Sequence, residues 1–324
     1  MVRKINKVAI IGSGIMGSRI ACHFANIGVE VLLLDILYKE AENDTKNKAL
    51  RNKIVNDSLN NTLKSKPSPI YSKKFTNRIK TGNLTDDIEK VNDSDWIIEV
   101  IIENLEIKKN LFEKIEQYRK KGSIISSNTS GIPINQMTEG RSEDFCKNFC
   151  GTHFFNPPRY LKLLEIIPSE KTEESLIKFL MSYGEKFLGK KTVLCKDTPA
   201  FIANRIGIAG IAALFKIIKE FQFSIEEVDS LTGPIIGRPK SATFRTCDLV
   251  GLDTLNNVAK GVYENCPNDE NRDIFKLPDF IDEMLQKKWL GDKTKQGFYK
   301  KTRDQKGKRK ILSLDLDNLS YQEK

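Results

Sequence analysis

Short apolar runs and amphipathic segments alternate along the first part of the chain. The runs Lys7 to Ile11 and Val29 to Leu34 flank a segment, Ile15 to Ile27, whose apolar residues have helical spacing and which Gly28 ends. Near-continuous apolar runs are typical of strands in a parallel sheet that helices cover on both faces. The pattern therefore predicts a strand, helix, strand unit at the start of the chain.

The same alternation continues to about residue 195, with one interruption. The segment 38–82 is rich in Lys, Asn and Ser, has two plausible helical stretches and is divided by Pro67 and Pro69, so we predict a helical arm that leaves the sheet. Beyond the arm, the periodicity predicts strands over residues 96–102, 123–126, 148–155 and 161–167, and helices over 105–119 and 172–188.

After Asp197 the spacing of the apolar residues is helical. It predicts helices over about 199–220, 224–232, 248–265 and 279–288, with Pro199 in the first turn of the first helix. We therefore predict an α/β domain with a Rossmann-type, mainly parallel sheet over residues 1–195, which includes the arm at about 38–82. An all-α domain follows over residues 196–324, and its last part, about 300–324, is a basic tail.

The composition limits the classes of protein to consider. A length of 324 residues suggests about two domains, and no apolar run approaches the ~18–20 residues that cross a membrane. Gly12, Ser13 and Gly14 interrupt the first apolar segment before it could serve as the apolar region of a signal peptide, so we expect a cytoplasmic protein. The six cysteines are widely spread, which argues against a disulfide framework and against a zinc site.

The chain carries an excess of positive charge. Its formal charge of +10, from 53 Lys and Arg against 43 Asp and Glu, is compatible with a nucleic-acid binder, a membrane-surface protein or an enzyme for polyanionic substrates. Much of the excess lies in residues 300–310, which have no interleaved aromatic residues to stack on bases. We therefore expect a solvated surface there and no nucleic-acid partner.

A glycine-rich turn joins the first predicted strand to the first helix. The spacing Gly12-x-Gly14-x-x-Gly17 suits the pyrophosphate of a dinucleotide, and Asp35 ends the second strand, where a carboxylate accepts hydrogen bonds from a ribose and repels a 2′-phosphate. We therefore predict NAD as the cofactor in preference to NADP. FAD on the same turn, and a glycine turn without a dinucleotide, are the alternatives. The turn residues predicted to bind the cofactor are Gly12, Gly14, Ile15, Met16 and Gly17.

Oxidation of an alcohol by hydride transfer needs a base for the hydroxyl proton, and histidine is the usual choice. The chain has two histidines, of which His23 lies within the first predicted helix and is expected to be packed there. His153 lies near the end of an apolar strand, and Glu165 lies on the next one. Two antiparallel strands would bring them together as an oriented base. A core histidine with an incidental charge partner is the alternative.

Four linked motifs extend across nearly the whole chain: Ser127-Asn-Thr-Ser130, His153-Phe-Phe-Asn-Pro157, Leu163-Leu-Glu165 and Asp197-Thr-Pro-Ala-Phe-Ile-Ala-Asn-Arg205. Together with the glycine turn, they resemble the L-3-hydroxyacyl-CoA dehydrogenase family in order and spacing. The segments Asp248 to Asp253 and Gln296 to Lys300 look closer to the dehydrogenase region of bacterial multifunctional fatty-acid oxidation proteins. Gly233 to Arg245 departs from the short single-function members.

The resemblance implies an activity and a set of catalytic residues. The activity is the NAD-dependent oxidation of (S)-3-hydroxyacyl-CoA to 3-oxoacyl-CoA in fatty-acid β-oxidation. His153 would be the base and Glu165 its orienting partner. Ser130 and Asn204 would contact the 3-oxygen or the thioester, and Asn156 would be a further substrate-binding residue. A turn or cap serine and a helix-surface asparagine are the alternatives for Ser130 and Asn204.

The resemblance also implies contacts with the cofactor and with coenzyme A. Glu103, taken as the carboxylate that ends its strand, and Lys108 match positions near the nicotinamide ribose, and Asn128 matches one beside the cofactor. The lysine-rich arm would contact coenzyme A. A solvated helix lysine is the alternative for Lys108, and a plain solvated face is the alternative for the arm.

Other functions and partners are compatible with the same residues. A 3-hydroxybutyryl-CoA or sugar-acid dehydrogenase, or a non-catalytic dinucleotide-binding protein, would use the same scaffold. The family implies a homodimer, with the second domain closing over the substrate. An enoyl-CoA hydratase region would follow if the chain is a fragment of a multifunctional protein, and a free-standing relative is equally compatible with the sequence.

Overall fold

The computed structural model describes residues 3–304 and 306–323, and the chain divides into two compact units. The first unit spans Met1–Phe201 and the second spans Ile202–Lys324. Within the described residues, no helix has both the length and the apolar character that crossing a membrane requires.

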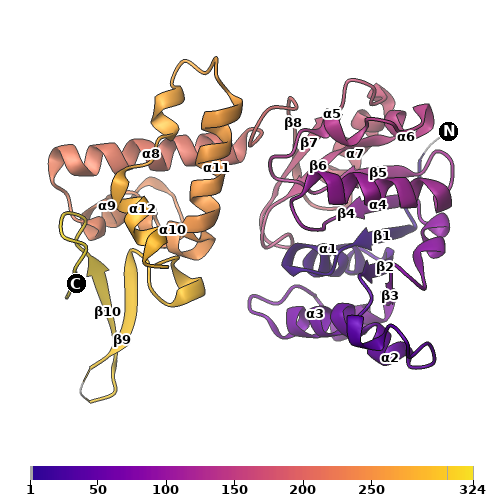
Figure 1. Ribbon diagram of the computed structural model, residues 1–324, viewed down its shortest axis with the longest axis horizontal. Coiled ribbons are helices and arrows are strands. Elements are labelled where there is room, and N and C mark those ends of the chain that lie inside the picture. Colours follow the sequence, from indigo (N-terminus) through magenta and orange to yellow (C-terminus); the bar gives the residue numbers. More distant parts are fainter. Residues whose placement is uncertain (1–2, 305, 324) are drawn as a thin grey trace. The chain divides into compact units, whose positions relative to one another are not determined.

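The first unit is built on an eight-stranded sheet with the order β3-β2-β1-β4-β5-β6-β7-β8 (Figure 1). Neighbouring strands are parallel except at β6 and β7, which are antiparallel, so the mainly parallel sheet is confirmed. The strands are β1 (Lys7–Ile11), β2 (Glu30–Asp35), β3 (Ile79–Asn83), β4 (Trp96–Glu99), β5 (Ile124–Ser127), β6 (Phe149–Phe154), β7 (Leu163–Pro168) and β8 (Lys191–Leu194).

Helices cover both faces of this sheet (Figure 1), and β1 shows why. Its residues alternate between two cores: Val8 and Ile10 pack with α1, α3 and α7, whereas Ala9 and Ile11 pack with α4, α5 and α6. The helices are α1 (Ile15–Asn26), α2 (Lys48–Arg51), α3 (Lys53–Lys64), α4 (Leu105–Tyr118), α5 (Ile134–Met137), α6 (Glu143–Lys147) and α7 (Glu174–Lys186). Short 3₁₀ turns are η1 (Lys39–Ala41), η2 (Lys73–Arg78) and η3 (Ile88–Asp93).

The segment predicted as an arm over 38–82 connects β2 to β3. Its last residues form β3, which pairs with β2 in the sheet, so the predicted end of the arm is wrong. Its helix α3 places Val55 and Leu59 in the same core as α1. Two apolar residues four positions apart are enough to dock one face of a helix, even where lysine and asparagine fill the other faces.

Two predicted boundaries also differ from the structure. Strand β4 ends at Glu99 and not at residue 102, so Glu103 lies beyond the strand. The helix predicted from residue 199 begins at Ala203, because Ala200 and Phe201 have φ values of 62° and 48°, which no right-handed helix accommodates.

The second unit surrounds an aromatic core. The rings of Phe215, Phe244, Phe280 and Phe298 contact one another, with the centroids of Phe244 and Phe298 4.7 Å apart. Its helices are α8 (Ala203–Phe221), α9 (Ile225–Leu231), α10 (Phe244–Val250), α11 (Leu252–Asn265) and α12 (Asp279–Gln286), and its 3₁₀ turns are η4 (Pro234–Ile236), η5 (Arg272–Phe275) and η6 (Asp292–Thr294).

The second unit is mainly helical, as predicted, but the prediction missed a small sheet. It contains an antiparallel sheet of β9 (Tyr299–Arg303), β10 (Arg309–Leu314) and β11 (Tyr321–Glu323). The predicted basic tail therefore contains strands, and Gln305 and Lys324 of that tail lie outside the described residues. The strand was missed because β9 continues after Tyr299 with lysine, threonine and arginine that are exposed or half-buried, which leave no apolar run.

Asp229 of α9 joins the helical part of this unit to the sheet. One carboxylate oxygen accepts hydrogen bonds from the backbone N–H groups of Thr243 and Phe244, at 3.0 and 2.7 Å. The other accepts from the N–H of Arg245 and from the hydroxyl of Tyr299, at 3.1 and 2.8 Å. Asp229 thus caps α10 and holds the first strand of the sheet.

We predict that Asp229→Ala lowers the free energy of unfolding of the second unit by about 2–3 kcal/mol, because it removes a helix cap and leaves buried donors without an acceptor. Urea denaturation followed by Trp289 fluorescence, in a Trp96→Phe background, measures this unit. Glu283→Ala, on the exposed face of α12, is the control. Equal stability of the two variants would contradict the role of Asp229.

Candidate active site

The three glycines of the first turn differ in what surrounds them. Gly12 has a φ of +104°, and a Cβ there would lie 2.5 Å from the carbonyl oxygen of Val100. A Cβ on Gly17 would lie 1.8 Å from the carbonyl oxygen of Gly12, whereas one on Gly14 would meet no atom within 4 Å. The first and third glycines are therefore required by packing, and the second leaves open backbone that a pyrophosphate can approach.

Asp35 lies beside this turn, as predicted. Its Oδ2 accepts hydrogen bonds from the N–H and the hydroxyl of Ser13, at 2.6 and 2.5 Å, and Oδ1 accepts from the N–H of Ile36. The turn lies at the carboxyl end of β1. The strand order reverses at β1, since β2 and β3 follow on one side of it and β4 and β5 on the other. Open parallel sheets bind ligands at the carboxyl end of the strands where this reversal occurs. The residues present thus fit a dinucleotide with a free 2′-hydroxyl.

The predicted contact between His153 and Glu165 is confirmed. The antiparallel register of β6 and β7 places the two residues opposite each other, and Nδ1 of His153 lies 2.7 Å from Oε2 of Glu165. The Glu165 side chain is fully buried and the His153 side chain is 6% exposed. Because a carboxylate only accepts, Nδ1 carries the proton and Nε2 is left as the basic nitrogen.

The other histidine is unsuited to proton transfer. His23 is buried, and its Nε2 lies 3.0 Å from the carbonyl oxygen of Leu188. Burial, aided by the nearby Lys190 ammonium, lowers the pKa of His23 to about 4. The prediction that His23 is a packed residue of the first helix is therefore confirmed.

The loop after β5 carries two predicted site residues and is tied to the strand of His153. The side-chain oxygen of Asn128 accepts a hydrogen bond from the N–H of Phe154, at 2.9 Å, next to His153. The N–H of Ser130 donates to Oε1 of Glu103, at 2.9 Å, and the Ser130 side chain is exposed. Glu103 therefore holds the turn that carries Ser130.

Lys108 is not a solvated helix lysine. Its side chain is 1% exposed, and its ammonium lies 2.5 Å from Oε1 of Glu99 and 3.4 Å from Oε2 of Glu103. Glu99 is fully buried at the end of β4. The sequence pattern does not indicate it as a site residue, because it assigns Glu99 to a longer apolar strand. A carboxylate in an otherwise apolar run was the signal available in the sequence.

Asn156 lies on the connection between β6 and β7 and is exposed. Its side-chain oxygen accepts a hydrogen bond from Arg19 of α1, at 2.7 Å, and the same guanidinium donates to the hydroxyl of Ser65, at 3.3 Å. Arg19 was also missed, because a single arginine in a helix gives no sign of its tertiary partners.

Asn204 belongs to the second unit. It is the second residue of α8, as the prediction of an early helical position requires, and its side chain is half-buried. Its contact with a substrate oxygen stays a prediction.

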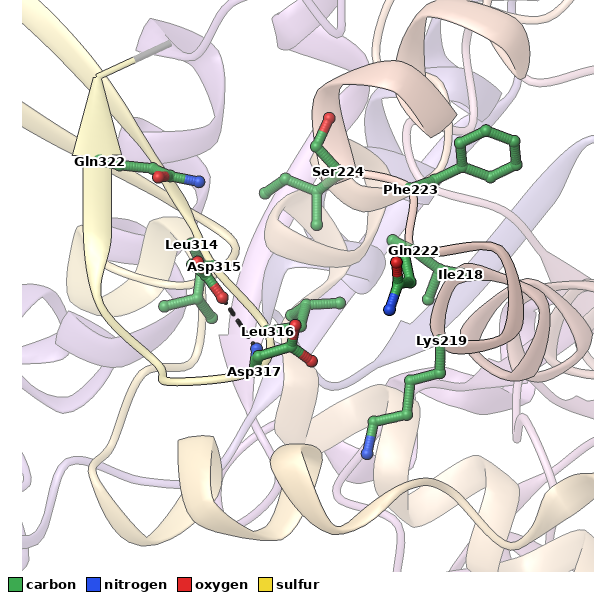
Figure 2. A pocket seen from close by; sticks show the side chains of 11 residues that line it. Ile218, Lys219, Gln222, Phe223, Ser224, Leu314, Asp315, Leu316, Asp317 and Gln322 are labelled. Atoms are coloured by element: carbon green, nitrogen blue, oxygen red, sulfur yellow. Dashed lines mark hydrogen bonds between the residues drawn. The ribbon is translucent and has the colours of Figure 1, made fainter.

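Figure 2 shows a pocket of the second unit that contains none of these residues. It lies between the connection from α8 to α9 and the turn from β10 to β11. Lys219, Gln222 and Asp317 are among its lining residues, and the Asp315 carboxylate accepts a hydrogen bond from the N–H of Asp317, at 2.9 Å. Because this carboxylate stabilises its own turn, the pocket shows no chemistry comparable to that of the first unit.

Comparisons with known proteins agree with this geometry. Residues 7–198 match the family model described as 3-hydroxyacyl-CoA dehydrogenase, NAD binding domain, and residues 201–301 match the model of the C-terminal domain. The chain belongs to the 3-hydroxyacyl-CoA dehydrogenase family. It is therefore an NAD-binding dehydrogenase of that family, and the predicted resemblance is confirmed.

Three members of the wider group illustrate the relation. A probable 3-hydroxyacyl-CoA dehydrogenase of Bacillus subtilis (strain 168) is 50% identical over 100% of this chain and 41% of its own length. A putative fatty acid oxidation complex trifunctional enzyme of Rickettsia felis is 36% identical over 99% of this chain and 44% of its own length. The crystal structure of (S)-3-hydroxybutyryl-CoA dehydrogenase PaaH1 from Ralstonia eutropha has a TM-score of 0.73 and 27% identity, over 91% of this chain and 98% of that one.

The chain thus spans less than half the length of the Bacillus subtilis and Rickettsia felis relatives. The match to the trifunctional enzyme agrees with the resemblance to multifunctional proteins.

We predict that two glycine substitutions separate stability from cofactor binding. Gly17→Ala lowers the free energy of unfolding by about 3 kcal/mol or more, because its Cβ collides with backbone. Gly14→Ala keeps stability within about 0.5 kcal/mol of the wild type, because its Cβ has open space, but weakens NADH binding by occupying the path of the pyrophosphate. Denaturation and NADH titration by fluorescence measure the two effects. Tight NADH binding by the Gly14→Ala variant would contradict the assignment.

Proposed function

We propose that this chain catalyses the NAD-dependent oxidation of (S)-3-hydroxyacyl-CoA to 3-oxoacyl-CoA in fatty-acid β-oxidation. The observation that supports it most strongly is the buried pair of His153 and Glu165 on the same sheet as the glycine turn. A base oriented by a carboxylate, on a sheet that binds a hydride acceptor, has the parts that alcohol oxidation needs.

The proton is taken by His153. Glu165 holds the proton on Nδ1, so Nε2 accepts the hydroxyl proton of the substrate and the ring becomes an imidazolium. The Glu165 carboxylate, 2.7 Å away, stabilises that positive charge. The glycine turn and Asp35 would hold NAD, which would supply the acceptor for the hydride on carbon 3. Ser130 and Asn204 donate hydrogen bonds to the substrate oxygen in this proposal, and Asn156 binds the substrate nearby.

Coenzyme A is the proposed carrier of the acyl group. A pocket between the glycine turn and α3 is lined by hydroxyl and amide side chains and by Arg19, whose positive charge suits a phosphate. Part of the basic charge of the segment 38–82 is used within the fold, since Arg51 pairs with Asp86 at 2.6 Å and Lys53 pairs with Asp57. The other lysines of this segment are available to the phosphates of coenzyme A in the proposal.

The substrate range and assembly are part of the same proposal. The likeness to a 3-hydroxybutyryl-CoA dehydrogenase supports a short acyl chain as the second candidate substrate. The longer relatives support a parent protein with further catalytic regions, such as an enoyl-CoA hydratase region. The exposed apolar side chains Ile206, Ile217 and Phe221 of α8 support a homodimer. The wide spread of the six cysteines along the sequence, which argues against a disulfide framework, supports a cytoplasmic protein in this proposal.

We predict that His153→Gln lowers kcat for acetoacetyl-CoA reduction by about 100-fold to 10,000-fold, because no base or acid then serves the 3-oxygen. NADH consumption measures the rate, and NADH titration serves as the control, with unchanged affinity expected. Equal rates in the wild type and the variant would remove His153 from the mechanism. No turnover of any acyl-CoA by the wild type would contradict the proposed function.

We predict that the KM for acetoacetyl-pantetheine, which lacks the nucleotide phosphates, exceeds the KM for acetoacetyl-CoA by about tenfold, because charge-assisted contacts with phosphate are lost. We also predict that Arg19→Met makes the ratio of these two KM values smaller, because the variant makes fewer such contacts with either substrate. Lys53→Met, which removes an ammonium already paired with Asp57, is the matched control and should preserve the difference. An unchanged ratio in the Arg19 variant would exclude Arg19 from phosphate binding.

A further inference from the structure

Glu99 lies where the three adjacent strands β1, β4 and β5 end. In the register of the sheet it lies opposite Ile11 of β1 on one side and Ser127 of β5 on the other. Ile11 immediately precedes the glycine turn, and Ser127 immediately precedes Asn128. The side chain of Glu99 therefore lies beneath the carboxyl edge at which both loops begin.

Every oxygen of this carboxylate has a defined partner. Oε1 accepts from the Lys108 ammonium, at 2.5 Å, and from the N–H of Ile101, at 2.7 Å. Oε2 accepts from the hydroxyl of Ser127. One buried group thus joins α4, the end of β4 and the end of β5.

The connection continues through Lys108 to the loop that carries Ser130. The charged groups that face the Lys108 ammonium are Glu99, from β4, and Glu103, from the connection between β4 and α4. Oε1 of Glu103 accepts hydrogen bonds from the hydroxyl of Thr129, at 2.5 Å, and from the N–H of Ser130, at 2.9 Å. Glu99 therefore fixes the first residue of the segment 127–130, and Glu103 fixes the last.

The glycine turn is in contact with the same region. The Cβ that Gly12 lacks would lie 2.5 Å from the carbonyl oxygen of Val100, the residue after Glu99. A change in the direction of the chain at residues 99–101 would therefore displace the backbone that the glycine turn contacts. Burial raises the pKa of Glu99, and the Lys108 ammonium opposes that shift.

We propose that Glu99 is a positioning residue for the dinucleotide: it fixes Lys108 and the loop 127–130 relative to the glycine turn, and so sets the shape of the cofactor site without touching the cofactor. The proposal depends on NAD binding by the first unit and does not depend on the acyl substrate. NADH binding in the absence of substrate therefore tests it apart from the proposed function.

The test compares Glu99→Gln, Lys108→Met and the double variant with the wild type by NADH titration. Glu139→Gln is the matched control, because Glu139 pairs with Lys109, the next residue of α4, and is 63% exposed. Glu99→Gln should weaken NADH binding by about tenfold or more, since a charged hydrogen bond that orients Lys108 is lost. Glu139→Gln should bind NADH as the wild type does.

Rescue by the conservative variant distinguishes positioning from mere stability. Without the Glu99 carboxylate, the buried ammonium of Lys108 loses its principal countercharge. Glu99→Asp keeps a carboxylate at this position and should recover NADH affinity relative to Glu99→Gln. Equal NADH affinity of these two variants would contradict the role of the charge.

Removing one charge of a buried pair can also unfold a protein, and the double variant covers that case because it leaves no buried charge unpaired. If Glu99→Gln does not fold, the affinity of the double variant decides the question. NADH binding within about twofold of the wild type by the folded single or double variant would overturn the proposal. A loss of thermal stability with unchanged NADH affinity would overturn it equally, because Glu99 would then be only structural.

Discussion

Burial of both faces of the eight-stranded sheet is the constraint on which the rest of the first unit depends. Strands β1, β2, β4 and β5 alternate apolar side chains between two helical layers, so the middle of the sheet has no place for an unpaired polar group. Polar side chains gather where strands end, as Asp35, Glu99 and Ser127 do. The cofactor site arises at that edge because it is the part of a covered sheet that can be both rigid and polar.

The same constraint explains why the buried charges come with partners. Lys108 and Glu99 form an ion pair, and His153 and Glu165 form a second pair inside β6 and β7. An ionised group in such surroundings would be costly by itself, whereas a pair with correct geometry persists. For His153 the pairing also has a chemical consequence, since it selects the nitrogen that stays basic.

Sequence patterns predicted the elements that are apolar and continuous. The strands around His153 and Glu165, and the strand before the glycine turn, lie close to where the periodicity placed them. The pattern failed for β3, which follows a lysine-rich connection, and for β9 and β10, which lie in a stretch rich in lysine and arginine. Such strands are stabilised by hydrogen bonds and side-chain contacts with the neighbouring strand. The sequence of one strand alone does not indicate these contacts.

The sequence by itself determined the type of fold, the cofactor turn with Asp35, and the pairing of the base with its carboxylate, because all three rest on residues close in sequence or on adjacent strands. Only the tertiary structure decided that Lys108 is buried, that Glu99 lies between three strand ends, and that Arg19 contacts Asn156. These contacts join segments whose relative position follows from the packing of helices on a sheet. No local pattern of residues encodes that packing.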